Sequence, residues 1–252
     1  MTLLGCFTGF MAGLLGIGGG MIITPFLIML IPSSLIPHEH IVHVAIATSL
    51  ATIAFTSLSS VRAHHKRGAV LWNVVASVAP GILVGAVVGA QIAGWLPTFW
   101  LSLIFAAFVG FSAFKMFLNK SPRPDRNLPG TIGKFFMGIA IGILSALVGA
   151  GGGFISVPWM IWCNVKMQNA VATSAAFGFP IALFGTIGYI ISGWNVSGLP
   201  PWPIDLGYIC IPALFSVAIT SVLLHARSKS RSLYRHKTLK KALACCCARL
   251  PL

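Results

Sequence analysis

Two glycine-rich motifs, GIGGGMIITP at residues 16–25 and GAGGGFISVP at residues 149–158, are the part of this chain best suited to chemistry. Each interrupts an apolar segment, where glycine lets the backbone turn and lets a ligand approach the main chain. A helix that restarts after such a turn presents unpaired N–H groups and the positive end of its dipole, which attract anions. We therefore predict an anion site at the two triplets, Gly18, Gly19 and Gly20, and Gly151, Gly152 and Gly153.

Glycine has a second use in membrane helices, which is to let two helices pack closely. Gly81, Gly85 and Gly89 fall at every fourth residue, as do Gly138 and Gly142, and this spacing is typical of helix contacts. For these five glycines we predict packing. Three consecutive glycines do not line up on one face of a helix, and each weakens the helix by about 1 kcal/mol. This favours a ligand role for the triplets.

Hydroxyl groups recur in two similar stretches, AIATS at residues 45–49 and AVATS at residues 170–174. Serine and threonine in membrane helices often bond to their own backbone, so a single hydroxyl of this kind carries little weight. The repetition in two segments that accompany glycine turns favours a shared role in holding the anion. The predicted ligand hydroxyls are those of Thr48, Ser49, Thr173 and Ser174.

Four polar residues near segment ends form a candidate vestibule that recruits the anion. Arg62 ends the segment that contains Thr48, and Lys166, Gln168 and Asn169 lie where the second motif meets the next segment. The general accumulation of basic residues on the cytoplasmic side is an alternative explanation that requires no role in anion binding.

The histidines and cysteines lack the spacing of a metal or catalytic site. His38, His40 and His43 lie in or next to a loop, where solvated histidines are expected, and no cysteine or acidic residue accompanies them in a metal-binding pattern. No Cys, His and Asp group has catalytic spacing either. We predict no metal, no cofactor and no enzymatic activity.

The composition is that of an integral membrane protein. The chain is 57% hydrophobic and 8% charged, whereas soluble domains carry about a quarter charged residues. We expect an all-α multi-pass protein in the lipid bilayer, with broken and re-entrant helices. Apolar stretches near the spanning length of roughly 20 residues lie at residues 43–61, 69–93, 98–118, 169–193 and 204–224, and two more, at 2–31 and 131–163, contain the glycine motifs.

The basic residues behind the net charge of +14 indicate how the protein is oriented in the membrane. Lysine and arginine gather at residues 62–67, at 115–134 and from 227 onward, and such loops face the cytoplasm. Because these basic residues lie in short loops and the tail, they form no continuous face for nucleic acid, which we exclude as a partner. The three acidic residues lie in loops or at segment ends, so no intramembrane carboxylate is available for coupling.

This loop polarity gives the two motifs opposite orientations in the membrane. The segment of the first motif ends outside, whereas the segment of the second begins and ends inside, so the two halves form inverted repeats. Duplicated breaks in inverted halves indicate a substrate site. We predict a first repeat at residues 1–120, a cytoplasmic linker at 121–130, a second repeat at 131–225 and an atypical basic tail at 226–252. In the tail either the last helix is lost or the sequence is altered.

With these features the chain resembles the TauE/SafE family of sulfite exporters. The resemblance rests on the two glycine motifs with Pro25 and Pro158, the two Ala-Thr-Ser stretches, Arg62 and the KTLKK string at residues 237–241. It implies a carrier of the bacterial or archaeal cytoplasmic membrane for small sulfur-containing anions, in which two inverted halves meet at a central site.

We therefore expect a secondary transporter that exports a sulfur-containing oxyanion, sulfite or an organosulfonate, across the cytoplasmic (inner) membrane. Alternating access would result from one half rocking against the other. An anion channel is the alternative, and a membrane-embedded enzyme is less favoured. The sequence leaves a homodimer open.

Overall fold

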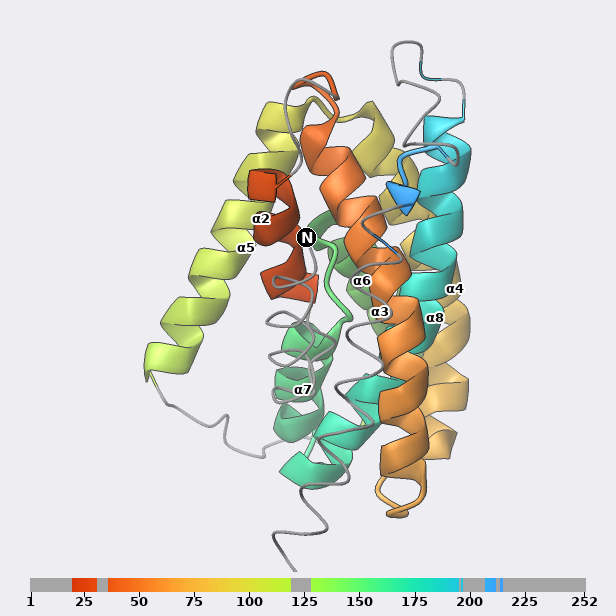
Figure 1. The fold of residues 1–252 in the computed structure, drawn as a ribbon. Coiled ribbons are helices and arrows are strands. Elements are labelled where there is room, and N and C mark those ends of the chain that lie inside the picture. Colours follow the sequence, from red (N-terminus) through yellow and green to blue (C-terminus); the bar gives the residue numbers. More distant parts are fainter. Residues whose placement is uncertain are drawn as a thin grey trace, which may run out of the picture.

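The computed structural model describes residues 20–30, 36–118, 128–194, 196, 207–211 and 214. Its elements there are seven helices (Figure 1), which confirms the expected all-α fold. They are α2 (Gly20–Leu30), α3 (Ile41–His65), α4 (Trp72–Trp95), α5 (Thr98–Leu118), α6 (Thr131–Val148), α7 (Gly153–Trp162) and α8 (Met167–Gly193).

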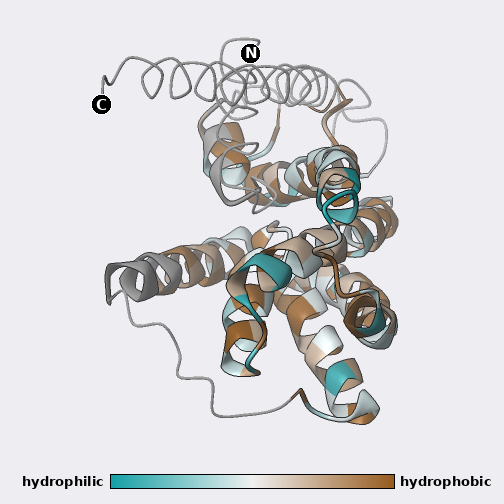
Figure 2. Ribbon diagram, turned by 90° about the horizontal axis from the view of Figure 1, so that it is seen from below, coloured by the Kyte–Doolittle hydropathy of each residue, from teal (hydrophilic) through white to brown (hydrophobic). Residues whose placement is uncertain are grey.

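Four helices, α3, α4, α6 and α8, are long and apolar enough to cross a membrane. They have 18 to 27 residues, which corresponds to about 27 to 40 Å at 1.5 Å per residue. By contrast, α2 and α7 have 11 and 10 residues and reach only part of the way. Hydrophobic residues recur along the outer helices in Figure 2, and large apolar side chains such as Val84, Leu103 and Ile187 are exposed. The protein is a multi-pass membrane protein.

The contacts between helices fix their relative directions. Leu50 of α3 lies next to Gly185 of α8, and Ser57 lies next to Gly178, so these two helices are antiparallel. Helix α2 precedes α3 and runs antiparallel to it, and α7 precedes α8 and runs antiparallel to it. Consequently α2 and α7 start near the middle of the molecule and run toward opposite ends, as Figure 1 shows.

The predicted glycine packing is confirmed between α4 and α6. A methyl group added at Gly85 would stand 2.3 Å from the carbonyl oxygen of Ile139, and one added at Gly142 would stand 2.7 Å from the carbonyl oxygen of Ile82. Gly81, Gly89 and Gly138 also face the backbone of the partner helix. Because no side chain separates the two backbones, these helices form one rigid pair.

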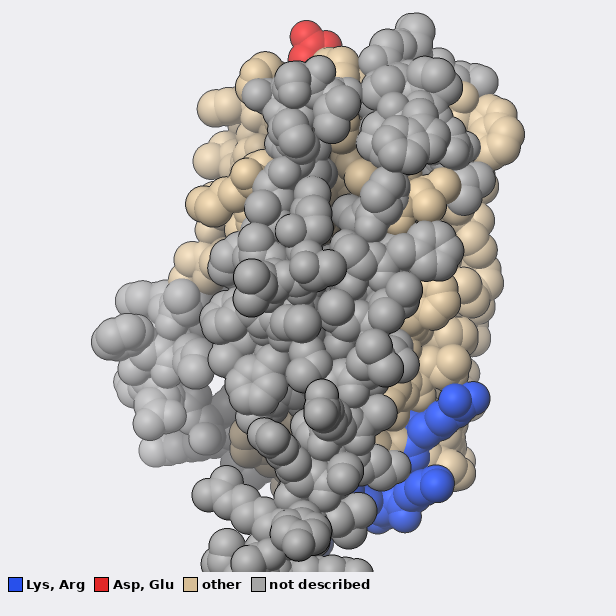
Figure 3. Space-filling view, viewed as in Figure 1, with Lys and Arg blue, Asp and Glu red and all other residues tan. Residues whose placement is uncertain are grey.

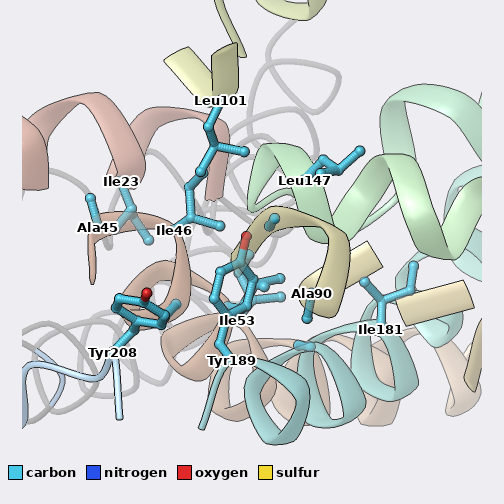
Figure 4. Close-up of a cluster of buried hydrophobic side chains, with 14 of the residues drawn as sticks. Ile23, Ala45, Ile46, Ile53, Ala90, Leu101, Leu147, Ile181, Tyr189 and Tyr208 are labelled. Atoms are coloured by element: carbon cyan, nitrogen blue, oxygen red, sulfur yellow. The ribbon is translucent and has the colours of Figure 1, made fainter. Parts of the chain in front are cut away.

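Helix α3 is the core of the molecule. Every residue from Ile41 to Ile53 is buried, and Figure 4 shows Ile46 and Ile53 in one cluster with Ile181 and Tyr189 of α8. A helix enclosed in this way tolerates polar side chains only where each finds a hydrogen-bond partner. The hydroxyl groups of α3 are therefore expected to have defined partners.

Candidate functional site

The second glycine motif breaks the chain between α6 and α7, as the sequence predicts. Helix α6 ends at Val148, and Gly149 caps it with a φ of 67°. Gly152 precedes α7 with a φ of 72°. Both angles lie in the left-handed region that side chains with a Cβ disfavour, so glycine is needed at these two positions. The 10 residues of α7 then return toward the end at which α6 began (Figure 1).

This break is enclosed by four other parts of the bundle. A methyl group added at Gly149 would stand 2.8 Å from Ser49 Oγ and 3.1 Å from Thr24 Oγ1. One added at Gly152 would stand 2.5 Å from Ile181 Cδ1, and one at Gly178 would stand 3.4 Å from the carbonyl oxygen of Gly151. The break therefore lies among α2, α3, α8 and the end of α6, away from lipid.

Side-chain hydroxyls bond the carbonyl groups of the break. Ser145 Oγ donates to the carbonyl of Ala150 at 2.7 Å. Ser49 Oγ lies 3.2 Å from the carbonyl of Gly149 and 2.8 Å from that of Ile46, and it accepts a hydrogen bond from Thr24 Oγ1 at 3.0 Å. These contacts hold the turn against α2 and α3, because Thr24 and Ser49 belong to those helices.

The amide groups of the break have a different environment. Within the described part of the chain, no residue accepts a hydrogen bond from the amides of Gly151, Gly152, Gly153 or Phe154. The three glycines are buried, and they stand at the positive end of the α7 dipole. Buried amides in need of acceptors, at a helix N-terminus, have the chemistry of an anion site.

The predicted hydroxyls form two matching sets of contacts. Thr48 Oγ1 accepts from the amide of Cys210 at 3.1 Å, and Thr173 Oγ1 accepts from the amide of Leu71 at 3.1 Å. Each threonine thus binds a backbone amide from a distant segment. Ser174 Oγ donates to the carbonyl three residues earlier, that of Val171, as Ser49 does to Ile46. Of the four, only Ser49 bonds directly to the break.

The first glycine motif is described in part. Gly18 and Gly19 lie outside the described residues, and Gly20 begins α2. Thr24, in the first turns of that helix, reaches Ser49 and through it the second break. Sequence reasoning missed both Thr24 and Ser145. Their signal was weak, since Thr24 lies within the first motif as a single hydroxyl and Ser145 precedes the second motif without a counterpart.

The predicted vestibule residues lie apart from the break before α7. Arg62, Lys166 and Gln168 are exposed and Asn169 is partly buried. Arg62 lies 13 residues beyond Ser49 on α3, about 20 Å along the helix. Figure 3 shows the described Lys and Arg side chains in view gathered near one end of the molecule, opposite the described acidic side chain.

One sequence interpretation is wrong. His43 was expected to be a solvated histidine in or next to a loop, but it lies in the first turn of α3 and is 2% exposed. Its Nε2 atom lies 2.9 Å from the carbonyl oxygen of Ala93. The helix begins two residues before His43, and the tertiary fold buries the ring against the end of α4.

Comparison with known proteins identifies the family. The family described as sulfite exporter TauE/SafE matches residues 1–245, which include both glycine motifs and both Ala-Thr-Ser stretches. The chain belongs to the TauE/SafE family. Membership makes it a membrane transporter rather than an enzyme, in agreement with the sequence prediction.

Several curated relatives match most of the chain. A probable membrane transporter protein of Haemophilus influenzae is 34% identical over 87% of this chain and 83% of its own length. One from Bacillus subtilis is 31% identical over 74% of this chain and 76% of its own length. One from Methanocaldococcus jannaschii is 27% identical over 87% and 80%. No solved structure matches significantly.

Proposed function

We propose that this TauE/SafE protein exports a small sulfur-containing oxyanion, sulfite or an organosulfonate, as a secondary transporter. The observation that carries the proposal is the buried break before α7, where four successive amides have no acceptor among the described residues. The oxygens of a sulfite or sulfonate group accept hydrogen bonds from such amides. Neutral donors also suit a carrier, because an anion held without a fixed positive charge leaves more readily.

Ligand groups from two halves of the bundle support a central site. Gly151, Gly152 and Gly153 of the second motif supply amides, and Gly18, Gly19 and Gly20 of the first are assigned the same role. The hydroxyls of Ser49 and Ser174 and of Thr48 and Thr173 lie on α3 and α8. A threonine that accepts one hydrogen bond keeps its own proton for donation to a ligand.

Alternating access is the transport mode that we infer. The opposite directions of α2 and α7, and the antiparallel α3 and α8, support inverted repeats at residues 1–120 and 131–225 with a linker at 121–130. Rocking of one repeat against the other would expose the site to each side in turn. The basic end then faces the cytoplasm, with Arg62 and Lys166 in the vestibule, and the protein lies in the cytoplasmic membrane.

The decisive experiment measures anion efflux from proteoliposomes that contain the purified protein. We expect saturable efflux of labelled sulfite or sulfoacetate and none of acetate, which lacks a sulfur oxyanion. Flux that rises linearly with concentration, accompanied by conductance in a planar bilayer, would identify an anion channel instead. Absence of sulfite and sulfoacetate flux from folded protein would refute the proposed substrates.

A substitution at Gly178 tests the position of the site. A methyl group at Gly178 meets only ordinary contacts, 3.4 Å from the carbonyl oxygen of Gly151 and 3.6 Å from Ser57 Cβ. Gly178→Ala should therefore transport, whereas the larger Gly178→Leu side chain enters the break and should slow efflux by about tenfold or more, which corresponds to 1.4 kcal/mol.

The matched control is Gly110→Leu on α5, where an added methyl group meets nothing within 4 Å. It introduces the same side chain into an open position and should transport at the wild-type rate. Wild-type efflux by folded Gly178→Leu protein would show that the anion passes elsewhere.

A further inference from the structure

A second buried polar cluster lies at the end of the molecule opposite the basic residues. His43 Nε2 lies 2.9 Å from the carbonyl oxygen of Ala93 and 3.1 Å from that of Leu96, at the C-terminal end of α4. The ring also stacks on Tyr208, with centroids 5.2 Å apart and planes at 25°. One imidazole thus joins α3, the end of α4 and the segment 207–211.

The partners of the ring fix its protonation in this arrangement. Two carbonyl groups can only accept, so Nε2 carries a proton. The other nitrogen, Nδ1, lies 3.5 Å from Thr98 Oγ1, beyond a good hydrogen-bond distance. Thr98 donates its own proton to the carbonyl of Glu39 and cannot donate to Nδ1 at the same time. A neutral imidazole therefore fits the closed arrangement.

A second proton would bind the Nδ1 lone pair and place a positive charge in a site that is 2% exposed. Among the residues that the structure describes, the titratable groups around the ring do not compensate that charge. The His40 ring centroid lies 6.1 Å away and adds repulsion when charged, and Tyr208 and its neighbour Tyr189 are neutral phenols. Glu39 offers its carbonyl, while its side chain is exposed.

The described helices that pack against the ring supply no counter-charge either. From α4 and α5 the ring meets carbonyl groups and the Thr98 hydroxyl, and α2 contains no titratable residue. The carbonyls of Ala93, Leu96 and Glu39 favour the charge, but no carboxylate of a described residue faces the ring, and the cost of burial outweighs them. The charged ring is therefore more stable in water than in the closed cluster.

We propose that His43 is a proton-binding site whose occupation opens the outer end of the transporter. A proton from outside binds Nδ1, the imidazolium leaves the Ala93 and Leu96 carbonyls for water, and the contact between α3, α4 and residues 207–211 loosens. Loss of the proton to water restores the closed cluster. The inference depends on the proposed transport function only where it links this opening to release of the anion.

Hydrogen–deuterium exchange of the purified protein in lipid nanodiscs tests the proton site without any anion. Between pH 8 and pH 5.5, after correction for the chemical exchange rate, we expect exchange in residues 93–98 and 207–211 to rise about tenfold. His43→Gln keeps an amide donor for the two carbonyls but does not titrate, so its exchange should not change with pH. His40→Gln, one helical turn away, is the matched control and should respond like the wild type.

Several outcomes would overturn the proposal. If hydrogen–deuterium exchange of the wild-type protein is the same at both pH values, the proposal is refuted. This result does not depend on whether any variant folds. A pH response that persists in folded His43→Gln, or that vanishes only in His40→Gln, would also exclude His43 as the proton site.

A second arm measures efflux of sulfoacetate, whose charge is constant in this range, with the external pH varied. Wild-type efflux should be faster at pH 5.5 than at pH 8, and the difference should be absent in His43→Gln. A pH-dependent exchange pattern in a protein that moves no sulfur oxyanion would leave the proton site intact and refute the proposed substrates. Sulfoacetate efflux with the same pH profile in wild type and His43→Gln would support the proposed substrate class and refute His43 as the proton site that controls opening.

Discussion

At the scale of the residue, two threonines predicted as anion ligands also connect distant parts of the chain. Thr48 binds the amide of Cys210, 162 residues away, and Thr173 binds the amide of Leu71, 102 residues away. Both amides belong to backbone outside the spanning helices. The bond to Cys210 is buried and the bond to Leu71 is partly buried. An amide that loses its acceptor in such a place is costly, so these hydroxyls stabilise the fold whether or not they also bind the anion.

Replacing Thr173 with valine should destabilise the protein. The change keeps the shape of the side chain but leaves the amide of Leu71 without its acceptor, at a cost of about 1 to 3 kcal/mol. The thermal midpoint in detergent should fall by several degrees, since 1 kcal/mol shifts it by about 2 to 4 °C in a chain of this size. Thr173→Ser keeps the hydroxyl and should unfold near the wild-type temperature.

The control for this prediction is Thr186→Val in the same helix. Thr186 Oγ1 donates to the carbonyl of Ala182 within α8, and that carbonyl stays within the helical hydrogen-bond pattern after substitution. Its midpoint should change less. Equal shifts in the two valine variants would mean that the bond to Leu71 contributes nothing specific.

At the scale of the element, glycine serves two separate purposes in this bundle. At Gly149 and Gly152 it provides left-handed backbone angles and creates the break before α7. In α4 and α6 it provides close contact between helices that continue without interruption. The rigid pair α4 and α6 thereby supports one side of the break, because α6 ends where the break begins.

Gly85→Ala should loosen the α4–α6 pair. Its methyl group would stand 2.3 Å from the carbonyl oxygen of Ile139, so the two backbones must separate, and overpacking of this kind costs about 1 to 3 kcal/mol. Gly110→Ala on α5 meets open space and gains helix propensity, so it should be neutral or stabilising. Thermal unfolding of both variants checks the prediction, and a Gly85→Ala midpoint at or above that of Gly110→Ala would contradict it.

At the scale of the whole molecule, local patterns were predictable and distant contacts were not. The glycine triplet at Gly151–Gly153 predicts the break because backbone freedom is a property of those residues alone. The bond from Thr24 to Ser49 and the burial of His43 against Ala93 depend on how helices pack, and no spacing encodes them. The sequence thus predicted the two glycine motifs of the site. It did not predict the hydrogen bonds from Thr24 and Ser145 that help to hold the break in place.

The orientation of the molecule is testable by cysteine labelling in cells. In a variant that lacks the six native cysteines, Glu39→Cys and Lys66→Cys place thiols at exposed positions beyond opposite ends of α3. Because basic loops are retained in the cytoplasm, a membrane-impermeant maleimide should label Glu39→Cys in intact cells and Lys66→Cys only after permeabilisation. Lys166→Cys should behave like Lys66→Cys, since α8 begins at the end where α3 finishes. The reverse pattern would place the basic end outside, and His43 would then respond to cytoplasmic rather than external protons.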